Sequence, residues 1–355
     1  MRVKSVLIFI LLLLGVSLYG YQIQQISITF IDPSRNNRQI PTQIFIPVDP
    51  SVRPMEEGSF PFIVFGHGWI QSYTVYQAIW EALVPLGWIM AFPTTEGNLF
   101  PSHQQFALDL AFLSFAIPQA GENPSSPLYN LVDPIAIAMG HSMGGGASVL
   151  AASGTHNFSA MATLAAANTN PSAVNAALNV TIPSLTFSGT SDSIAPPSSH
   201  QIPIYNNLAS IYKSFISLNG VTHTGINSNG IVFSLLEPWL EYIMNGEGYY
   251  LALYESMLDD YQVNGNVTYL IENYLPPENL NILIADGWLT ISWDKTLGAE
   301  YYIVEATTNP DLQFFDVSSE TGIFSEDDIR VFWSIQIDEN EPRLFYRVKA
   351  LRNLL

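Results

Sequence analysis

The sequence predicts an α/β domain with a mostly parallel central sheet, followed by a small all-β sandwich domain. Short apolar runs alternate with stretches of helical periodicity along most of the chain. Apolar runs of this length are typical of strands that are buried on both faces of a sheet. A helix between two strands returns the chain to the end of the sheet where the first strand began, so the two strands run parallel. Such crossovers are right-handed. From residue 280 on, the periodicity changes to two residues without any helical pattern, which predicts the all-β part.

The α/β domain is expected over residues 21–262. In chain order, its predicted strands are residues 23–31, 42–46, 62–65, 88–92, 134–139, 161–166, 184–187 and 213–218. Its predicted helices are residues 75–86, 104–115, 143–152, 202–211 and 231–244. The first two strands alternate apolar and polar residues, whereas the later ones are continuous apolar runs, so the later strands form the buried centre of the sheet.

The end of the chain is divided by a double proline at residues 276–277. Residues 249–275 have the pattern of a terminal helix and a tether, and we place a linker at residues 263–279. The β domain follows at residues 280–355. There Leu289, Ile291 and Trp293 share one face of a predicted strand, as the two-residue period requires.

The first 20 residues have the pattern of a secretory signal peptide. Arg2 and Lys4 precede a short apolar run, and Gly20 provides a small residue at its end. A membrane anchor is the alternative, but the run is shorter than the about 20 residues that a spanning helix needs. We therefore expect residues 1–20 to be removed, and the protein to be secreted by a bacterium into the medium or the periplasm.

Composition and charge narrow the classes of function. The chain has 355 residues, 48% of them hydrophobic, so it can bury a large core. Its net charge is −19 with only 12 lysines and arginines. This charge argues against a function in binding nucleic acid, because proteins bind nucleic acid by neutralising its phosphates. It also argues against docking on anionic lipid. There is no cysteine, which excludes disulfides and thiolate metal sites.

Residues 140–144, GHSMG, have the G-x-S-x-G pattern that surrounds a nucleophilic serine. A buried-strand pattern ends at Met139 and a helix pattern begins at Met143, and such a serine requires this strand–turn–helix setting. The turn is strained, and neighbours without side chains leave room for it. The pattern therefore predicts Ser142 as a nucleophile, with its Oγ exposed at the carboxyl edge of the sheet.

A nucleophilic serine needs a base, and the base needs an acid that orients it. Asp192 is the only acidic residue between Ser142 and His223, and it follows the strand predicted at residues 184–187. His223 lies in the loop after the strand predicted at residues 213–218. A lone aspartate or histidine more often has a surface or capping role. Three such residues in this order, each after a predicted strand, favour a catalytic triad.

Two backbone N–H groups are needed to bind the oxyanion of an acyl-transfer intermediate. One is expected from Met143, which follows the serine, and the other from Trp69 in the GHGW segment after an early strand. We interpret His67 as a structural residue that holds this segment by a side-chain hydrogen bond, and His141 as a packing residue.

The remaining histidines have no catalytic context. His200 begins a helical pattern, so we expect it to face solvent or to cap that helix. His103 and His156 have no supporting motif. No group of His, Asp and Glu has metal-ligand spacing, so we expect neither a metal nor another cofactor.

Three segments together resemble the bacterial cutinase and polyester hydrolase family. They are GHSMGGG at residues 140–146, DSIAP at residues 192–196 with His200 following, and GVTH at residues 220–223. This family is the dienelactone hydrolase-like branch of the α/β-hydrolases, and it includes polyethylene terephthalate hydrolases. The resemblance covers roughly residues 25–245.

The resemblance implies a serine carboxylic-ester hydrolase with an α/β-hydrolase fold. Ser142 would be the nucleophile, His223 the base and Asp192 the acid. The oxyanion donors would be Trp69 and Met143, and the substrate contacts would be Trp69, Met143 and Ile194.

The chain departs from this family in two places that bear on substrate. Trp69 stands where the family usually has Tyr or Phe. Residues 165–171 contain no aromatic residue, whereas the family usually has a tryptophan there that clamps an aromatic ring. The second departure argues against efficient use of aromatic polyesters. Separately, residues 289–293, 301–305 and 345–350 resemble fibronectin type III modules, which implies a β-sandwich spacer or adhesion unit.

The sequence thus predicts a secreted serine esterase that acts on aliphatic esters or polyesters, with polyethylene terephthalate as a further candidate. No long insertion would form a lid, so we expect an open groove. We also expect a monomer that binds neither nucleic acid nor, once the signal is removed, a membrane. The alternatives are a small-ester or lipid esterase, similar to platelet-activating-factor acetylhydrolase or chlorophyllase, and an inert binding or adhesion protein.

Overall fold

The computed structural model describes residues 20–48, 59–273, 279–295, 301–307, 315–317, 323–327, 330–336 and 345–351. The predicted signal peptide, apart from Gly20, and the double proline lie outside the described residues. The chain divides into two compact units. The first contains the residues up to Ala209 and Phe215–Tyr269, and the second groups Leu270–Leu355 with Ser210–Ser214.

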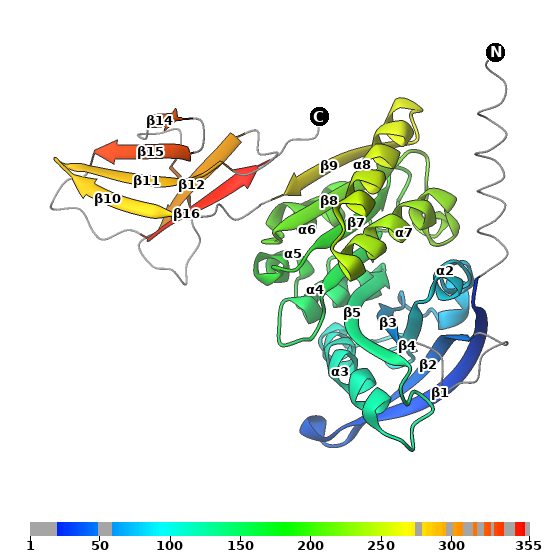
Figure 1. Ribbon diagram of the computed structural model, residues 1–355. Helices are drawn as coiled ribbons and strands as arrows, with labels where there is room; N and C mark the ends of the chain where they lie inside the picture. The colour runs from blue at the N-terminus through cyan, green and yellow to red at the C-terminus, as the bar shows by residue number, and fades with distance from the viewer. Residues whose placement is uncertain are drawn as a thin grey trace, which may run out of the picture. The chain divides into compact units, whose positions relative to one another are not determined.

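The first unit contains most of a nine-stranded sheet in the order β1-β2-β4-β3-β5-β6-β7-β8-β9, and parts of β8 and β9 are grouped with the second unit (Figure 1). Its strands are β1 (Gln22–Asp32), β2 (Arg38–Val48), β3 (Phe60–Gly66), β4 (Ile89–Pro93), β5 (Val132–His141), β6 (Ala160–Leu164), β7 (Ser184–Gly189), β8 (Tyr212–Leu218) and β9 (Val267–Asn273). The pairs from β4 through β3, β5 and β6 to β7 are parallel, whereas β1–β2 and β2–β4 are antiparallel. The predicted α/β class with a mostly parallel sheet is confirmed.

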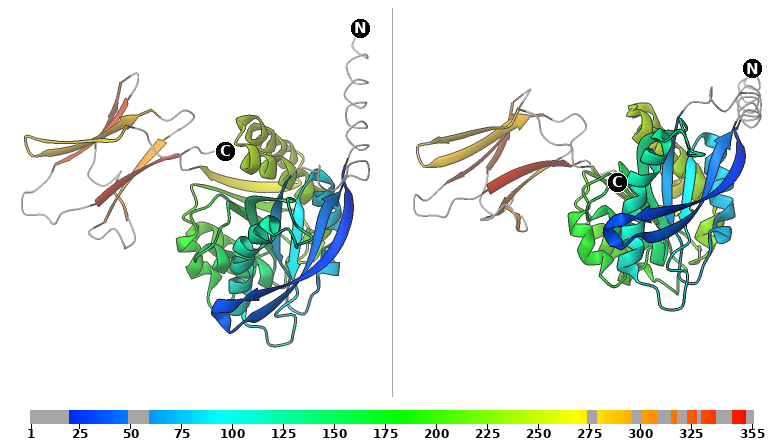
Figure 2. Two further views of the ribbon diagram at one scale, coloured as in Figure 1. Left: turned by 60° about the horizontal axis from the view of Figure 1, so that its bottom comes forward. Right: turned by 90° about the horizontal axis from the view of Figure 1, so that it is seen from below.

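Helices cover both faces of this sheet (Figures 1 and 2). They are α2 (Gln77–Leu83), α3 (His103–Glu122), α4 (Met143–Ala152), α5 (Ala173–Ala176), α6 (Gln201–Asn207), α7 (Gly230–Asn245) and α8 (Gly248–Val263). Short 3-10 turns are η1 (Pro33–Arg35), η2 (Tyr73–Tyr76), η3 (Val84–Leu86), η4 (Ala177–Asn179), η5 (Pro197–Ser199) and η6 (Gly225–Ser228). α3 packs against α4, and α7 packs against α8 and α2. Every residue of β3, β4, β6 and β7 is buried, as continuous apolar strands predict. Within the described residues, no helix has the length and apolarity needed to cross a membrane.

One part of the predicted linker, residues 263–279, differs from the structure. Val267–Asn273 form β9, which lies beside β8 at the edge of the main sheet. Val267, Tyr269 and Ile271 are buried, and the residues between them are exposed, so the segment has the alternation of an edge strand. A salt bridge of 3.2 Å between Lys213 and Glu272 also joins the two strands. The remaining domain boundaries stay predictions.

The second unit contains two antiparallel sheets, in the orders β10-β11-β15-β14 and β13-β12-β16. Its strands are β10 (Asn281–Ala285), β11 (Trp288–Asp294), β12 (Tyr301–Thr307), β13 (Phe315–Asp316), β14 (Ile323–Glu326), β15 (Arg330–Gln336) and β16 (Phe345–Leu351). One hydrophobic cluster joins Trp293 and Trp333 of the first sheet to Val304 and Val348 of the second. Shared burial of this kind means that the sheets pack face to face. The predicted all-β domain is confirmed, and its likeness to fibronectin type III modules stays a prediction.

Candidate active site

Ser142 lies in a sharp turn between the end of β5 and the start of α4. Its φ of 55° and ψ of −120° are costly for a residue with a side chain, so the surroundings must hold this backbone in place. The N–H of Ser142 donates to Leu164 O at 3.0 Å. Its carbonyl accepts the N–H groups of Gly146 at 3.0 Å and Ala167 at 2.9 Å. The turn is therefore fixed to β6 and to the loop that follows β6.

Two of the glycines around the serine are required by close backbone approach. A Cβ on Gly144 would overlap the carbonyl of Gly66, at the end of β3. A Cβ on Gly140 would overlap the carbonyl of Gly144 itself. Real Cβ atoms do not approach carbonyl groups so closely, so both positions must lack a side chain for α4 to start where it does.

The structure brings together Ser142, His223 and Asp192, the three residues of the predicted triad. His223 Nδ1 lies 2.7 Å from Asp192 Oδ2, and His223 Nε2 lies 2.8 Å from Ser142 Oγ. A carboxylate only accepts, so Nδ1 carries the proton and Nε2 presents a lone pair to the serine hydroxyl. The three side chains come from the loops after β5, β7 and β8. In this arrangement the serine can give its proton to the imidazole as it attacks an acyl carbon.

Asp192 is held by its own loop. Its Oδ1 accepts the N–H groups of Ile194 at 2.9 Å and Ala195 at 2.8 Å, while Oδ2 faces His223. Both Asp192 and His223 are buried. With both oxygens hydrogen-bonded, the carboxylate has one orientation, and it fixes the tautomer of the ring.

Met143 and Trp69 are the two residues whose backbone N–H groups the sequence predicts as oxyanion donors. Met143 is the first residue of α4, so its N–H has no carbonyl acceptor within the helix. Met143 is only 4% exposed, and its side chain belongs to the hydrophobic core cluster. Before Trp69, the carbonyl of Gly68 accepts the N–H of Gln71 at 3.1 Å and lies 2.8 Å from His67 Nδ1. Because C=O and N–H point in opposite directions across a trans peptide, these contacts orient the N–H of Trp69.

His67 has the side-chain role expected from the sequence. Its ring is buried, and its second nitrogen lies 2.9 Å from Thr95 O. The ring thus lies between its own loop and the segment that follows β4.

Exposed apolar side chains lie on the loops of Trp69 and Asp192 and on the loop between β4 and α3. Trp69 is 56% exposed, and its indole N–H donates to Leu99 O at 3.2 Å. Phe100 is 90% exposed, and Ile194, on the loop of Asp192, is exposed as well. We call Trp69, Ile70, Leu99, Phe100 and Ile194 the apolar rim.

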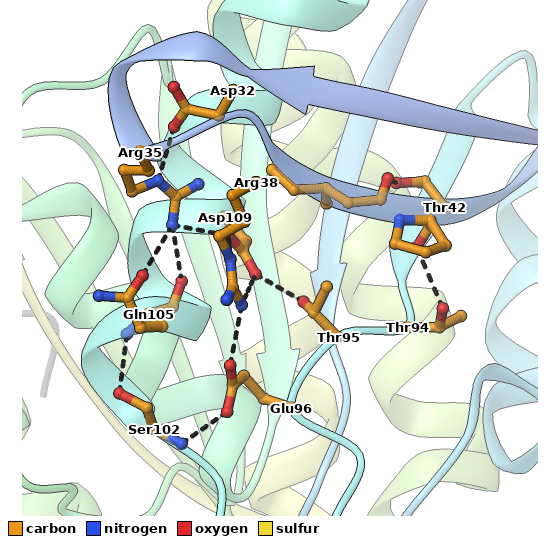
Figure 3. Close-up of polar contacts among 12 residues, drawn as sticks. Asp32, Arg35, Arg38, Thr42, Thr94, Thr95, Glu96, Ser102, Gln105 and Asp109 are labelled. Carbon is orange, nitrogen blue, oxygen red and sulfur yellow. Dashed lines mark hydrogen bonds and ion pairs between the residues drawn. The ribbon is translucent and has the colours of Figure 1, made fainter.

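The loop between β4 and α3, which carries part of the apolar rim, is anchored by a network of ion pairs (Figure 3). Arg38 binds the fully buried Asp109 through two contacts of 2.7 Å. Arg38 also binds Glu96 at 2.8 Å, and the other oxygen of Glu96 accepts the N–H of Ser102 at 2.6 Å. The hydrogen bond to Asp109 raises the pKa of Arg38 above its ordinary value, so the cation is permanent. The loop is thereby fixed at both of its ends.

Two histidines have contacts that sequence reasoning missed. His103 Nδ1 accepts the N–H of Asn170 at 3.0 Å, and His200 Nδ1 accepts the N–H of Asn168 at 2.9 Å. The ring of His200 therefore binds the loop after β6 rather than capping α6, and burial lowers its pKa. These bonds join segments that are distant along the chain, and no local sequence pattern indicates them. Among the described residues, no group of three or more His, Asp or Glu side chains is arranged to hold a metal ion.

Comparison with known proteins gives a match over the middle of the chain. Residues 85–257 match a family model described as PET hydrolase-like, and this range includes Ser142, Asp192 and His223 but not Trp69. Cutinase est1 of Thermobifida alba is 28% identical over 191 residues, which are 53% of this chain and 62% of the relative. Cutinase 1 of Thermobifida cellulosilytica is 32% identical over 141 residues, which are 39% of this chain and 52% of the relative.

A third relative has a different named substrate. The bis(hydroxyethyl) terephthalate hydrolase of Streptomyces coelicolor is 32% identical over 114 residues, which are 32% of this chain and 36% of the relative. The chain thus spans between about a third and three fifths of the length of these relatives. Together, the matches show that the middle of the chain is similar to cutinases and to PET hydrolase-like proteins.

Proposed function

We propose that this protein is a secreted serine carboxylic-ester hydrolase of the cutinase type, with an α/β-hydrolase fold in its first unit. The observation that carries the proposal is the continuous line of hydrogen bonds from Asp192 through His223 to Ser142. The relatives named as cutinases support ester hydrolysis as the reaction. Secretion rests on the signal-peptide pattern of residues 1–20.

The reaction proceeds through an acyl-enzyme. Ser142 Oγ attacks the ester carbonyl carbon while His223 Nε2 takes its proton, and Asp192 stabilises the imidazolium that forms. The N–H groups of Trp69 and Met143 bind the oxyanion. The bond to the alcohol then breaks, and His223 gives the proton to the leaving oxygen. Water repeats both steps on the acyl-enzyme, which releases the acid and restores the serine.

The apolar rim favours bulky, uncharged esters. Trp69, Met143 and Ile194 are the proposed substrate contacts, and an open groove between their loops would admit a polymer chain. Because residues 165–171 contain no aromatic side chain, we rank aliphatic polyesters above polyethylene terephthalate as substrates. The second unit, with two sheets around one tryptophan-containing core, is proposed as a fibronectin type III-like spacer without chemistry of its own.

The test compares the wild type with Ser142→Ala on p-nitrophenyl butyrate, polycaprolactone film and amorphous polyethylene terephthalate film. We expect hydrolysis of the first two, weaker hydrolysis of the third, and losses of about a thousandfold or more in the variant. Ser153→Ala, at the other end of α4, is the matched control and should retain activity, because Ser153 Oγ donates to Leu150 O, within the last turn of the helix.

The results separate this function from its alternatives. Cleavage of the butyrate with both films untouched would indicate a small-ester or lipid esterase. A folded wild type that cleaves none of the three and is not labelled by a fluorophosphonate would indicate a binding or adhesion protein.

A further inference from the structure

The hydroxyl of Tyr76 contacts the loop that carries Trp69. Tyr76 is the last residue of η2 and is fully buried, and its Oη accepts the N–H of Gly68 at 2.7 Å. The hydroxyl also contacts Gln71 Oε1 and lies 3.2 Å from His141 Nδ1. Burial raises the pKa of Tyr76, so the hydroxyl keeps its proton. One buried hydroxyl therefore fixes the main chain immediately before Trp69.

His141 extends this contact to His223. His141 is fully buried, and its Nε2 lies 2.9 Å from the carbonyl oxygen of His223. A carbonyl only accepts, so Nε2 carries the proton. Burial lowers the pKa of His141 to about 4, so the ring is neutral near pH 7 and Nδ1 has a lone pair. The single proton of the Tyr76 hydroxyl is available to this lone pair or to Gln71.

Two buried side chains thus join the loop of the proposed oxyanion donor to the residue proposed as the base. We propose that Tyr76 is a positioning residue for ester hydrolysis. Through its contact with His141, it holds the Trp69 N–H and the His223 imidazole in the correct positions relative to Ser142. The inference rests on the function proposed above. Because Tyr76 and His141 are fully buried, neither is placed to touch a substrate.

The contact of Tyr76 with His141, which we call the bridge, should affect stabilisation of the transition state more than it affects substrate binding. Without the Tyr76 hydroxyl, the buried N–H of Gly68 loses its acceptor, and the adjacent peptide shifts to recover one. A small displacement of an oxyanion donor weakens stabilisation of the transition state. The apolar rim, which would bind the ground state, keeps its side chains.

The experiment is Tyr76→Phe, which removes one oxygen, with Tyr73→Phe as the matched control. Tyr73 belongs to the same 3-10 turn, and its hydroxyl accepts a hydrogen bond from exposed Gln25 at 3.4 Å. For Tyr76→Phe we expect kcat on p-nitrophenyl butyrate to fall about tenfold, with KM within about twofold of wild type. The downfield proton resonance of His223 Nδ1–H should move. Tyr73→Phe should leave all three quantities unchanged.

A double-mutant cycle with His141→Gln adds a second criterion. If Tyr76 acts through His141, the loss in the double variant should be clearly smaller than the product of the two single losses. Independent, multiplicative losses would overturn the proposal. So would a Tyr76→Phe variant with wild-type kcat and only a lower unfolding temperature, which would assign the hydroxyl to stability alone.

The resonance separates this inference from the function on which it rests. A wild type that neither hydrolyses esters nor reacts with a fluorophosphonate would refute the proposed function. Even then, an unmoved His223 proton in Tyr76→Phe would overturn the bridge, and a shifted proton would support it.

Discussion

His141 lies next to Ser142, and burial of its ring opposes protonation. Its ordinary pKa of 6.5 falls to about 4 in the folded protein, chiefly because of burial. Between these two values the unfolded chain binds more protons than the folded one. The stability that depends on a neutral His141 is therefore fully present above about pH 6.5 and is lost as the pH falls through about 4.

We expect His141→Gln to flatten the pH dependence of stability. For the wild type, this ring should account for a loss on the order of 3 kcal/mol in the free energy of unfolding between neutral pH and about pH 4. Glutamine does not titrate, so the variant should lack this component even if it is less stable at neutral pH. Urea unfolding across this range measures both slopes. Equal slopes would show that burial of the ring does not shift its titration.

At the scale of elements, the loop between β4 and α3 combines a fixed backbone with exposed apolar side chains. Arg38, Glu96 and Asp109 anchor it, so Phe100 is presented to solvent without collapsing onto the core. An exposed aromatic ring on a fixed loop can lie flat on an uncharged solid surface at little entropic cost. A protein with a net charge of −19 would be repelled by an anionic surface.

We therefore expect Phe100→Ser to lower hydrolysis of polycaprolactone film about threefold to tenfold more than it lowers hydrolysis of soluble p-nitrophenyl butyrate. Adsorption to the film, measured in a Ser142→Ala background, should fall in parallel. Val263→Ser is the control, because Val263 is 86% exposed at the end of α8 and lies outside the apolar rim. If both variants adsorb like the wild type, the loop does not contact the polymer.

The elements that the sequence predicted are those whose burial leaves a local pattern. Strands buried on both faces are short apolar runs, and α4 begins where the G-x-S-x-G segment requires. Val267–Asn273, which form β9, instead lie in the stretch that the sequence pattern assigns to a tether, between a terminal helix and the double proline. The one-turn helix α5 is too short to show a helical period.

At the scale of the whole molecule, the sheet gathers the proposed chemistry at one edge. Ser142, Asp192 and His223 each follow a strand of the sheet, so their order along the chain was sufficient to predict that they meet. The contact of Tyr76 with His141 spans 65 residues and belongs to no motif. It joins side chains of η2 and the end of β5, and sequence periodicity does not encode such a contact.

The division of the chain leads to a last prediction. A chain that ends after residue 279 should retain its unfolding temperature in the first unit and its activity on p-nitrophenyl butyrate, because β9 is complete. A chain that ends after residue 262 should lose much of its stability. It would lack the buried Val267, Tyr269 and Ile271, each worth about 1.5–3 kcal/mol, from a total of about 5–15 kcal/mol.

Thermal unfolding and film adsorption of the two shortened chains decide between the interpretations. Wild-type stability in the chain that ends after residue 262 would show that β9 is dispensable, and would restore the tether interpretation of residues 263–279. If the chain that ends after residue 279 adsorbs to polyester film as the full chain does, the second unit is a spacer. A clear loss of adsorption with unchanged activity on soluble ester would instead give that unit a role in binding the polymer, because it would separate attachment to the surface from the chemistry at Ser142.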